Sequence, residues 1–410
     1  MITIIGAGMG GLTTALALHQ RGIECQLFES AQEIQPLGVG INLLPHACKE
    51  VTELGLLDVL RQSGIETQEL HYYNRHGQQV WRENRGLAAG YEWPQISIHR
   101  GELQMLLLDA VLERLGPDAL RTGMAAESVA YDASGAEVTF TTAEGRTERV
   151  SSRGVIAADG IHSSIRRQFY PDEGMPIWNG SVLWRGLIET EPFLGGRSMF
   201  MAGHESQKFV AYPVSQSHYL DGRSQTNWIA ELRYDTTALK DREDWNRRGD
   251  FGEFAPQFES WQFDWLNVPE LIEQAPICYE FPMVDRDPVA TWSFDGVTLL
   301  GDAAHPMYPI GSNGASQAIL DARCIADQLQ AHESDIARAF KAYEAIRLPL
   351  TAAIVKANRG NGPEQVMQLA EERAPDGFAD LEAVIPLTER QAIADRYKQI
   401  AGFAKNSLNA

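Results

Sequence analysis

Three glycines near the start of the chain have the spacing of a nucleotide-binding turn. Gly6, Gly8 and Gly11 follow a short β-branched run at residues 2–5 and precede an apolar pattern with helical spacing. In such a strand–turn–helix unit the first glycine permits a tight turn, the second lets the backbone approach a pyrophosphate, and the third lets helix and strand pack. The phosphate charge would then face a helix N-terminus. The spacing therefore predicts dinucleotide binding.

An acidic residue about 20 residues further along supports this prediction. Residues 25–29 indicate a second buried strand, parallel to the first because the intervening helix returns the chain to the same edge. Glu29 ends that strand, where its carboxylate could accept both hydroxyls of an adenosine ribose. If the glycine motif is taken alone, an ordinary turn that contains glycines is the alternative to dinucleotide binding. FAD and NAD(P) share this signature, so other residues must decide between them.

Two further motifs each follow a predicted buried strand. Residues 159–166 read Asp-Gly-x-x-Ser-x-x-Arg after a strand at 154–158, and residues 301–305 read Gly-Asp-Ala-Ala-His after a strand that ends at Leu300. Together with the glycine turn, these motifs have the order and separation found in the single-component flavoprotein aromatic hydroxylases, the class of para-hydroxybenzoate hydroxylase. The chain resembles this family over about residues 1–355.

Within the family, the chain is particularly similar to the phenazine hydroxylases that act on 5-methylphenazine-1-carboxylate. The similarity is stronger in the FAD-binding part than in the substrate part, which favours a related reaction over an identical substrate. The segments that carry it are residues 36–42, 98–104, 184–186, 211–213, 282–288 and 311–317.

The resemblance implies FAD as a cofactor held without a covalent bond. It also implies that NADH or NADPH binds transiently, reduces FAD and leaves, since no second Gly-x-Gly-x-x-Gly is present. Gly6, Gly8 and Gly11 would hold the pyrophosphate and Glu29 the ribose. The other cofactor contacts that the resemblance implies are Gly40, Ile41, Arg100, Gln104, Asp159, Asp302, Pro309, Gly311, Asn313, Gly314 and Ala315.

Four of these polar side chains have specific implied roles and simpler alternatives. Arg100 would face the pyrophosphate and ribityl region, or be a surface charge beside a helix start. Gln104 would contact the ribityl chain, or be an exposed helix residue. Asp302 would accept a ribityl hydroxyl, or cap the following helix. Asp159 would serve FAD and the nicotinamide nucleotide, or form a capping arrangement with Ser163.

Two backbone segments are implied to lie along the flavin ring. Residues 309–315 should bring a helix N-terminus to the pyrimidine edge, where amides would stabilise negative charge on reduced flavin. Many family members have Gly-x-Gly there, whereas this chain has Gly-Ser-Asn-Gly at 311–314. Residues 38–42 would pass the ring at N5, or form a simple strand.

A flat substrate pocket is predicted beside the flavin. Side chains from a tryptophan-rich sheet are candidates to line it, although ordinary core packing would explain them too. Arg185 could meet a substrate carboxylate or point into solvent. A structural or cavity-lining role is favoured for His305, because no second ligand has metal spacing. The candidate pocket residues are Val39, Trp184, Tyr212, Met283, His305 and Pro309.

The implied reaction is hydroxylation of an aromatic or heteroaromatic acid, phenazine-type acids included, through a flavin C4a-hydroperoxide formed with oxygen. The sequence offers no Ser/His/Asp set or paired carboxylates, so no catalytic acid or base is assigned. One alternative is a flavin-dependent halogenase, whose Trp-x-Trp-x-Ile-Pro motif is absent. A nicotinamide dehydrogenase and a flavin-binding regulatory or scaffold protein without turnover are the others.

The composition limits the kinds of partner that the chain is expected to have. The 410 residues carry a formal charge of −20, which repels polyanions and argues against nucleic acid. Cys25, Cys48, Cys278 and Cys324 are widely spaced, which fits a reducing cytoplasm and indicates neither disulfides nor zinc. The chain lacks a run of about 18 apolar residues, so no membrane span is predicted. A monomer or homodimer is expected.

The order of the predicted elements indicates an α/β fold. A Rossmann-like FAD-binding domain, formed by residues 1–66, 97–176 and 278–361, would be interleaved with a mostly antiparallel β-sheet substrate domain, formed by 67–96 and 177–277. Residues 362–410 would add C-terminal helices. We also expect one helix over about 45–62 and a hairpin that turns at residues 76–77.

Overall fold

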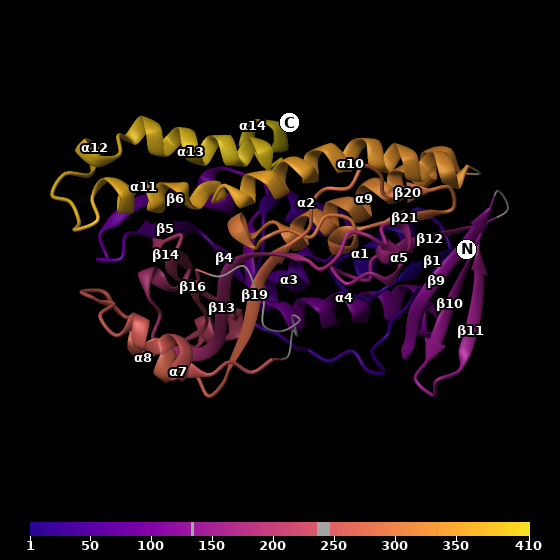
Figure 1. Ribbon diagram of the computed structural model, residues 1–410, viewed down its shortest axis with the longest axis horizontal. Helices are drawn as coiled ribbons and strands as arrows, with labels where there is room; N and C mark the ends of the chain where they lie inside the picture. The colour runs from indigo at the N-terminus through magenta and orange to yellow at the C-terminus, as the bar shows by residue number, and fades with distance from the viewer. Residues whose placement is uncertain (133–134, 236–246, 334) are drawn as a thin grey trace.

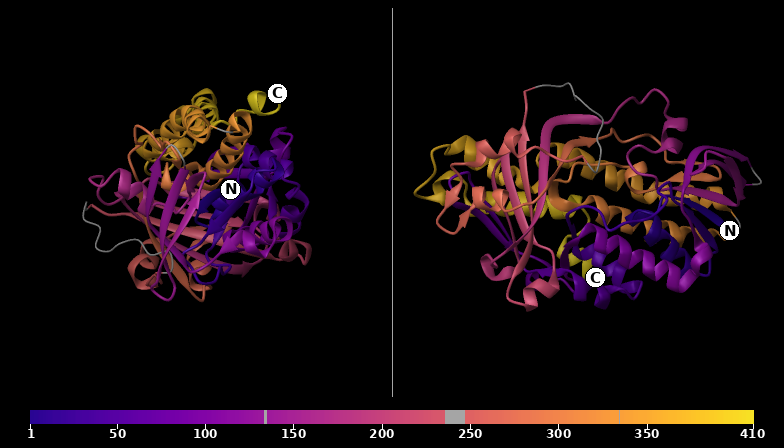
Figure 2. Two further views of the ribbon diagram at one scale, coloured as in Figure 1. Left: turned by 90° about the vertical axis from the view of Figure 1, so that its right-hand side faces the viewer. Right: turned by 90° about the horizontal axis from the view of Figure 1, so that it is seen from below.

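The computed structural model describes residues 1–132, 135–235, 247–333 and 335–410. Two sheet-based units lie side by side along the long axis of the molecule (Figure 1). Figure 2 shows the C-terminal helices, orange to yellow, gathered on one side of both units. None of the helices in these ranges combines the length and apolar character needed to cross a bilayer.

The first unit is built on a six-stranded sheet with the order β20-β21-β12-β1-β2-β8. All neighbours are parallel except β20 and β21. Short runs of buried β-branched residues form these strands because both faces are covered. The Rossmann-like prediction is therefore confirmed. The strands are β1 Ile2–Ile5, β2 Cys25–Phe28, β8 Leu120–Arg121, β12 Gly154–Ala157, β20 Ser293–Phe294 and β21 Val297–Leu299.

Helices and the three-stranded sheet of residues 124–152 both pack against this sheet, and the rings of Phe28 and Phe140 stack 4.7 Å apart between the two sheets. Helix α1 packs against α9 and α4, and α9 packs against α10. The face of α1 that carries Leu12 and Leu16 is fully buried in the largest hydrophobic core. The helices are α1 Met9–Gln20, α2 Pro45–Glu53, α3 Leu57–Ser63, α4 Arg100–Leu115, α5 Ser164–Phe169, α9 Gly314–His332 and α10 Ile336–Arg359.

The second unit is a seven-stranded sheet with the order β19-β13-β16-β15-β14-β5-β6. Only β14 and β5 pair in parallel, so the mostly antiparallel prediction is confirmed. One face is covered by the aromatic cluster around α7 Phe251–Phe254 and α8 Val268–Glu273. The strands are β5 Glu69–Tyr73, β6 Gln79–Asn84, β13 Ile177–Thr190, β14 Ser198–His204, β15 Gln207–Pro213, β16 Ser224–Arg233 and β19 Cys278–Asp285.

Smaller elements complete the fold. Two three-stranded sheets, ordered β3-β7-β4 and β11-β10-β9, flank the parallel sheet. Their strands, with the β17-β18 pair, are β3 Gly40–Leu43, β4 Ile65–Thr67, β7 Gln95–His99, β9 Met124–Asp132, β10 Gly135–Thr142, β11 Thr147–Ser152, β17 Gln262–Phe263 and β18 Leu266–Asn267. The short helices are α6 Gln216–Leu220 and the 3-10 turns η1 Gly86–Ala89, η2 Pro117–Ala119, η3 Leu194–Gly196, η4 Ala255–Phe258, η5 Gly301–Ala303, η6 Ile310–Ser312 and η7 Gly362–Glu364.

Two local predictions have different outcomes. The hairpin is confirmed, since Gly77 has φ +76° and its N–H donates to the Asn74 carbonyl between β5 and β6. The single helix over 45–62 is wrong, because the chain forms α2 and α3 with a break at Gly55. Gly55 has φ +70°, the left-handed conformation that ends a helix.

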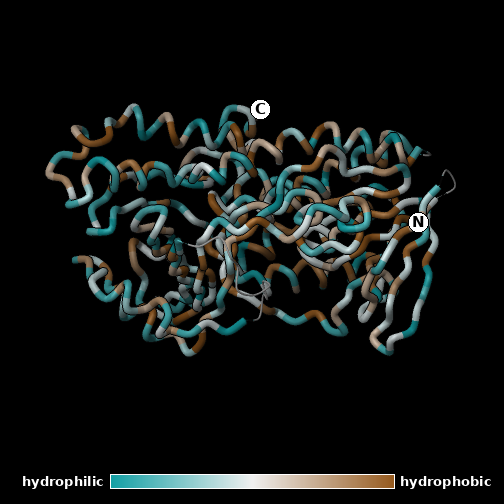
Figure 3. The backbone as a smooth tube through the Cα atoms, in the orientation of Figure 1, coloured by the Kyte–Doolittle hydropathy of each residue, from teal (hydrophilic) through white to brown (hydrophobic). Residues whose placement is uncertain are grey.

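The C-terminal helices close the second face of the large sheet. Val366, Met367, Ala370 and Ala394 share one core cluster with sheet residues such as Tyr72. Hydrophobic and hydrophilic residues alternate along this part of the chain (Figure 3). The segment is therefore part of the fold. Its helices are α11 Gln365–Arg373, α12 Leu381–Val384, α13 Leu387–Ile400 and α14 Lys405–Leu408.

This packing predicts that Met367→Ala destabilises the whole protein. Met367 is 1% exposed, and removing a buried side chain of this size costs about 2–5 kcal/mol. We expect the urea midpoint to fall accordingly. Leu387→Ala is the control, because Leu387 is 53% exposed and should shift the midpoint little. Equal midpoints for Met367→Ala and the wild type would contradict the packing.

Candidate active site

The glycine turn leaves an opening at its second glycine. A Cβ on Gly6, which has φ +96°, would lie 2.5 Å from the Ala158 carbonyl oxygen, and one on Gly11 would lie 1.9 Å from that of Gly6. These two glycines let β1, α1 and the end of β12 approach. A Cβ on Gly8 would meet nothing within 4 Å, and Gly8 begins α1 without a side-chain cap. The first amides of α1 thus face open space suited to a phosphate.

Glu29 and Gln104 both contact the glycine turn. The Ala7 N–H donates to Glu29 Oε2 at 2.8 Å, and the Ala31 N–H donates to Glu29 Oε1 at 2.8 Å. Gln104 Nε2 donates to the Ala7 carbonyl at 2.9 Å. Ser30 Oγ also donates to Glu29 Oε1 at 3.0 Å, so these bonds fix the half-buried carboxylate beside the opening at Gly8. Among the described residues Glu29 Oε2 accepts one hydrogen bond, and it keeps a lone pair for a further donor.

Arg100, Asp302 and Arg185 border one desolvated region, which we call the cleft. Both side chains are exposed, yet desolvation lowers the pKa of Arg100 and raises the pKa of Asp302. A group that is accessible but desolvated must be surrounded by protein. The charges of the two groups act on each other, and the charge of Arg185 lowers the pKa of Arg100 further. The cleft therefore brings together residues from α4, β13 and the turn after β21.

The Asp-Gly motif contains the capping arrangement that the sequence left open. Asp159 Oδ2 accepts a hydrogen bond from the Ser164 N–H at 3.0 Å, and Ser163 Oγ accepts one from the Arg166 N–H at 2.9 Å. Burial raises the pKa of Asp159. Its Oδ1 has no hydrogen-bond partner among the described residues, so this carboxylate can accept one more donor.

Arg166 fastens the second motif to the third. Its guanidinium is 1% exposed and donates from Nη1 to the carbonyls of Ala303 at 2.9 Å and Ala304 at 2.7 Å. Its Nη2 also pairs with Glu173 Oε1 at 2.5 Å. Arg166 therefore sets the position of the turn that carries Asp302.

His305 belongs to a buried charge cluster behind this turn. Its Nε2 lies 2.5 Å from Asp321 Oδ2, and Asp321 also accepts from the Gly301 N–H at 3.1 Å and from Arg347 Nε at 2.7 Å. Burial alone would raise the pKa of Asp321, but His305 and Arg347 outweigh it and lower the pKa. The ring of His305 is 3% exposed and packs 5.4 Å from that of Trp292. The structure thus gives His305 a structural setting behind the turn that carries Asp302, whose pKa the charge of His305 lowers.

Residues 38–42 lie against the large sheet. The Gly40 N–H donates to Asn227 Oδ1 at 2.8 Å, and Arg185 Nη2 donates to the Gly40 carbonyl at 2.5 Å. A Cβ on Gly40 would lie 2.7 Å from the Tyr212 ring, so only glycine fits. Arg185 therefore points inward, between β3 and the sheet. Val39 is buried and Ile41 is half-buried in the same segment.

The loop before α9 is fixed by a C-terminal tyrosine. Asn313 Nδ2 donates to the Tyr397 hydroxyl at 2.9 Å, and a Cβ on Gly311 would lie 2.1 Å from that oxygen. Helix α9 begins at Gly314 without a side-chain cap, and a Cβ there would meet nothing within 4 Å. Its first amides, including that of Ala315, thus face open space.

The remaining predicted pocket residues divide between two faces of the large sheet. Tyr212 is on the same face as Arg185, and Met283 packs with Tyr308 on that face. Pro309 is exposed in the loop opposite. Trp184 is on the other face, where its ring stacks 4.8 Å from that of Phe254. Core packing, the alternative stated for Trp184, is what the structure shows.

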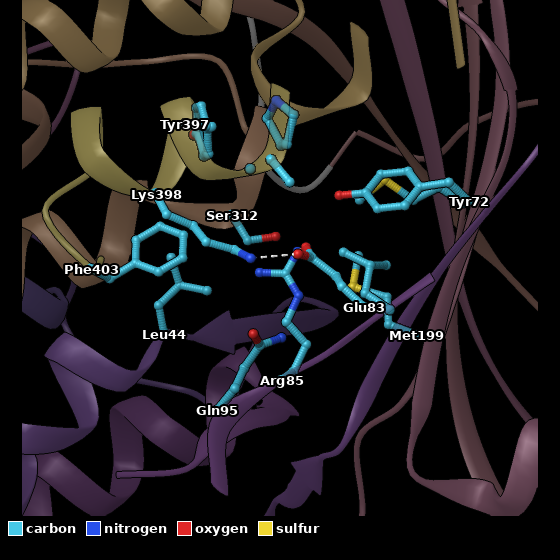
Figure 4. Close-up of a pocket in the computed structure, with 15 residues that line it drawn as sticks. Leu44, Tyr72, Glu83, Arg85, Gln95, Met199, Ser312, Tyr397, Lys398 and Phe403 are labelled. Carbon is cyan, nitrogen blue, oxygen red and sulfur yellow. Dashed lines mark hydrogen bonds and ion pairs between the residues drawn. The ribbon is translucent and has the colours of Figure 1, made fainter. Parts of the chain in front are cut away.

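A polar cavity has no counterpart among the features that the sequence predicts. It lies between the large sheet, the loop at 311–312 and α13, and encloses about 20 Å³. Figure 4 shows Arg85, Gln95 and Lys398 directing their polar ends into it. Arg85 and Lys398 are 313 positions apart (398 − 85), so no local pattern could have joined them.

The parallel sheet with its open glycine turn and the adjoining antiparallel sheet fit the fold of the FAD-dependent aromatic hydroxylases. The family model described as "FAD binding domain" matches residues 1–182 and 279–358, and the chain belongs to this family. It is an FAD-dependent aromatic monooxygenase.

Individual relatives agree with this assignment. The chain is 44% identical over 399 residues to phenazine 1,6-dicarboxylic acid hydroxylase PhzS of Lysobacter antibioticus, covering 96% of this chain and 97% of that protein. It is 32% identical to 3-amino-4-hydroxybenzoate 2-monooxygenase PtmB3 of Streptomyces platensis, covering 98% and 96%. Klebsiella pneumoniae HpxO complexed with FAD and uric acid superposes with a TM-score of 0.76 at 25% identity, covering 100% and 97%.

The clamp by Arg166 predicts a stability effect. Arg166→Met removes the charged donor of the Ala303 and Ala304 carbonyls, and a hydrogen bond to a charged group is worth about 1.5–3 kcal/mol. Glu173 keeps Arg286 as a partner at 3.1 Å. We expect a lower urea midpoint and weaker FAD retention, because the turn that carries Asp302 loses its support. Arg167→Met, on the exposed side of α5, is the matched control. An Arg166→Met protein as stable as this control would exclude the clamp.

The cleft predicts that Asp302→Asn weakens FAD binding. A hydrogen bond to a charged group is worth about 1.5–3 kcal/mol, so the FAD dissociation constant should rise by about ten- to a hundredfold. Fluorescence titration of the apoprotein measures it. Asp109→Asn, on the exposed face of α4, should leave it unchanged. An unaltered constant for Asp302→Asn would contradict the ribityl contact that the resemblance implies.

Proposed function

We propose that this chain hydroxylates a phenazine-type aromatic carboxylic acid, with dioxygen as the oxygen source and NADH or NADPH as the reductant. The observation that carries the proposal is the 44% identity to a phenazine dicarboxylic acid hydroxylase, which extends over the substrate sheet and the C-terminal helices as well as the FAD-binding part. Similarity confined to the cofactor domain would support only flavin binding.

Different residues around the cleft would bind different parts of FAD. The amides that begin α1, at the opening of Gly8, would bind the pyrophosphate, and Glu29 would accept the ribose hydroxyls. Arg100 and Asp302 would hold the phosphate and ribityl groups. The amides that begin α9 would face the pyrimidine edge and stabilise negative charge there.

Bound FAD supplies the activation of dioxygen. The protein's own part is to position the aromatic ring and keep water away. Leu44, Met199 and Met201 are buried apolar side chains that border the cavity beside the loop at 311–312. They would exclude water from the space next to the flavin.

The other finer expectations belong to this proposal as well. The interleaved domain boundaries, the location in the cytoplasm and the assembly as a monomer or homodimer remain predictions from the sequence.

In the balanced reaction, one oxygen atom of dioxygen enters the ring, and the other leaves as water with the electrons of NAD(P)H.

A substrate screen tests the proposal. The FAD-loaded enzyme is given NADH or NADPH with phenazine-1-carboxylate, phenazine-1,6-dicarboxylate, hydroxybenzoates or 6-hydroxynicotinate, and products are identified by mass. We expect a phenazine acid to accelerate NAD(P)H oxidation and to yield a product with a new hydroxyl group. Hydroxylation of a benzoate or nicotinate, with none of a phenazine acid, would contradict the proposed substrate class.

A further inference from the structure

The polar cavity next to the flavin loop is built from distant parts of the chain. Arg85 follows β6, Gln95 begins β7 and Lys398 lies on α13 (Figure 4). Gly311 and Ser312, from the loop that precedes α9, line the same cavity. A group bound here would therefore sit beside the loop that is proposed to face the flavin.

Two buried side chains in this cavity lack hydrogen-bond partners. Arg85 is 8% exposed and Gln95 is 2% exposed, and within the described ranges Arg85 Nε and Gln95 Oε1 bond to nothing. Buried polar groups are nearly always satisfied, because each unmade hydrogen bond is costly. An amide can present its N–H₂ where its oxygen was assigned, so Gln95 can also donate. Arg85 Nε therefore offers a donor to an acceptor in this cavity, and the Gln95 amide can donate beside it in its other orientation.

The charges of the cavity favour an anion. Glu83 Oε1 accepts from Arg85 Nη2 at 2.5 Å, and Glu83 Oε2 accepts from Lys398 Nζ at 2.6 Å. Glu83 is the only acid among the described lining residues, so two cations share one carboxylate. The neighbouring Glu364 bonds to Lys208 Nζ at 2.5 Å and not to this pair. One more carboxylate would balance the cluster.

The size of the cavity indicates which part of a ligand enters. A space of about 20 Å³ holds a water molecule or a similarly small polar group, and not an aromatic ring. Apolar walls surround it, among them Leu70, Met199 and Phe403. A ring would lie outside this space, and only its small anionic substituent would reach Arg85 and Lys398.

We propose that Arg85, Gln95 and Lys398 bind a carboxylate of the aromatic substrate. The inference rests on the proposed function, and it gives α13 a part in substrate specificity. Arg85 and Lys398 supply charge-assisted hydrogen bonds, and Glu83 holds the two cations in place through its ion pairs with both.

Paired ligands test this site. Phenazine-1-carboxylate and uncharged phenazine are titrated into the FAD-loaded enzyme, and the change in flavin absorbance gives each dissociation constant. Lys398→Met should weaken binding of the carboxylate by about tenfold or more and leave phenazine within about twofold. Lys398→Arg should restore most of the affinity. Arg396→Met, an exposed neighbour on α13, is the matched control and should change neither constant.

A second variant provides a test of the site if the Lys398→Met protein does not fold. Gln95→Glu introduces a negative charge of nearly the same shape, and it should repel the carboxylate while phenazine still binds. If either variant weakens the binding of both ligands equally, or of neither ligand, the cluster is a structural ion pair and the proposal is overturned.

The outcomes also separate this site from the proposed function. If the wild-type enzyme hydroxylates aromatic compounds without preferring those with a carboxylate, the proposed function stands and the proposed carboxylate site is overturned. If the wild-type enzyme binds phenazine-1-carboxylate through Lys398 and transfers no oxygen, the proposed carboxylate site stands and the proposed function is overturned.

Discussion

The buried carboxylate of Asp321 is the interaction on which the site depends. It lies on α9 and accepts hydrogen bonds from the Gly301 N–H, from His305 and from Arg347 of α10. An unpaired charge at this depth would be very unfavourable, so the three donors must stay together. They fix the turn after β21 against two long helices. Arg166 holds the same turn from the other side. The position of Asp302 in the cleft follows from these two attachments.

An acidic chain must also hold an anionic cofactor. With a formal charge of −20, the protein as a whole repels a pyrophosphate, so local groups have to overcome that field. The open N-termini of α1 and α9 and the desolvated Arg100 are such groups. The same logic extends to the polar cavity, where Arg85 and Lys398 face a single acid, Glu83.

Local patterns predicted the parts of the site that depend on neighbouring residues. The spacing of Gly6 and Gly11 reflects a contact within one strand–turn–helix unit, so it could be recognised in the sequence. The alternation along β13 predicted a strand but not which face meets the cavity. Both faces of that sheet are covered, by α7 and α8 on one side and by C-terminal helices on the other. Trp184 and Arg185 therefore could not be assigned to a face.

Contacts between distant segments were beyond such patterns. His305 resembled a cavity residue because its partner Asp321 lies on a different element, and the sequence gives no sign of the hydrogen bond between them. Lys398 reaches Glu83 only because α13 folds back over the large sheet. The break between α2 and α3 depends on the backbone conformation of Gly55, which the apolar spacing around it does not reveal.

Isotope labelling tests the central claim, oxygen transfer to an aromatic acid, most directly. The FAD-loaded enzyme turns over a phenazine acid with NAD(P)H under ¹⁸O₂ in ordinary water, and the product is analysed by mass spectrometry. The account predicts one ¹⁸O atom in the new hydroxyl group for each product molecule. A product that carries only oxygen from water, or NAD(P)H oxidation that yields labelled hydrogen peroxide and no hydroxylated product, would contradict it.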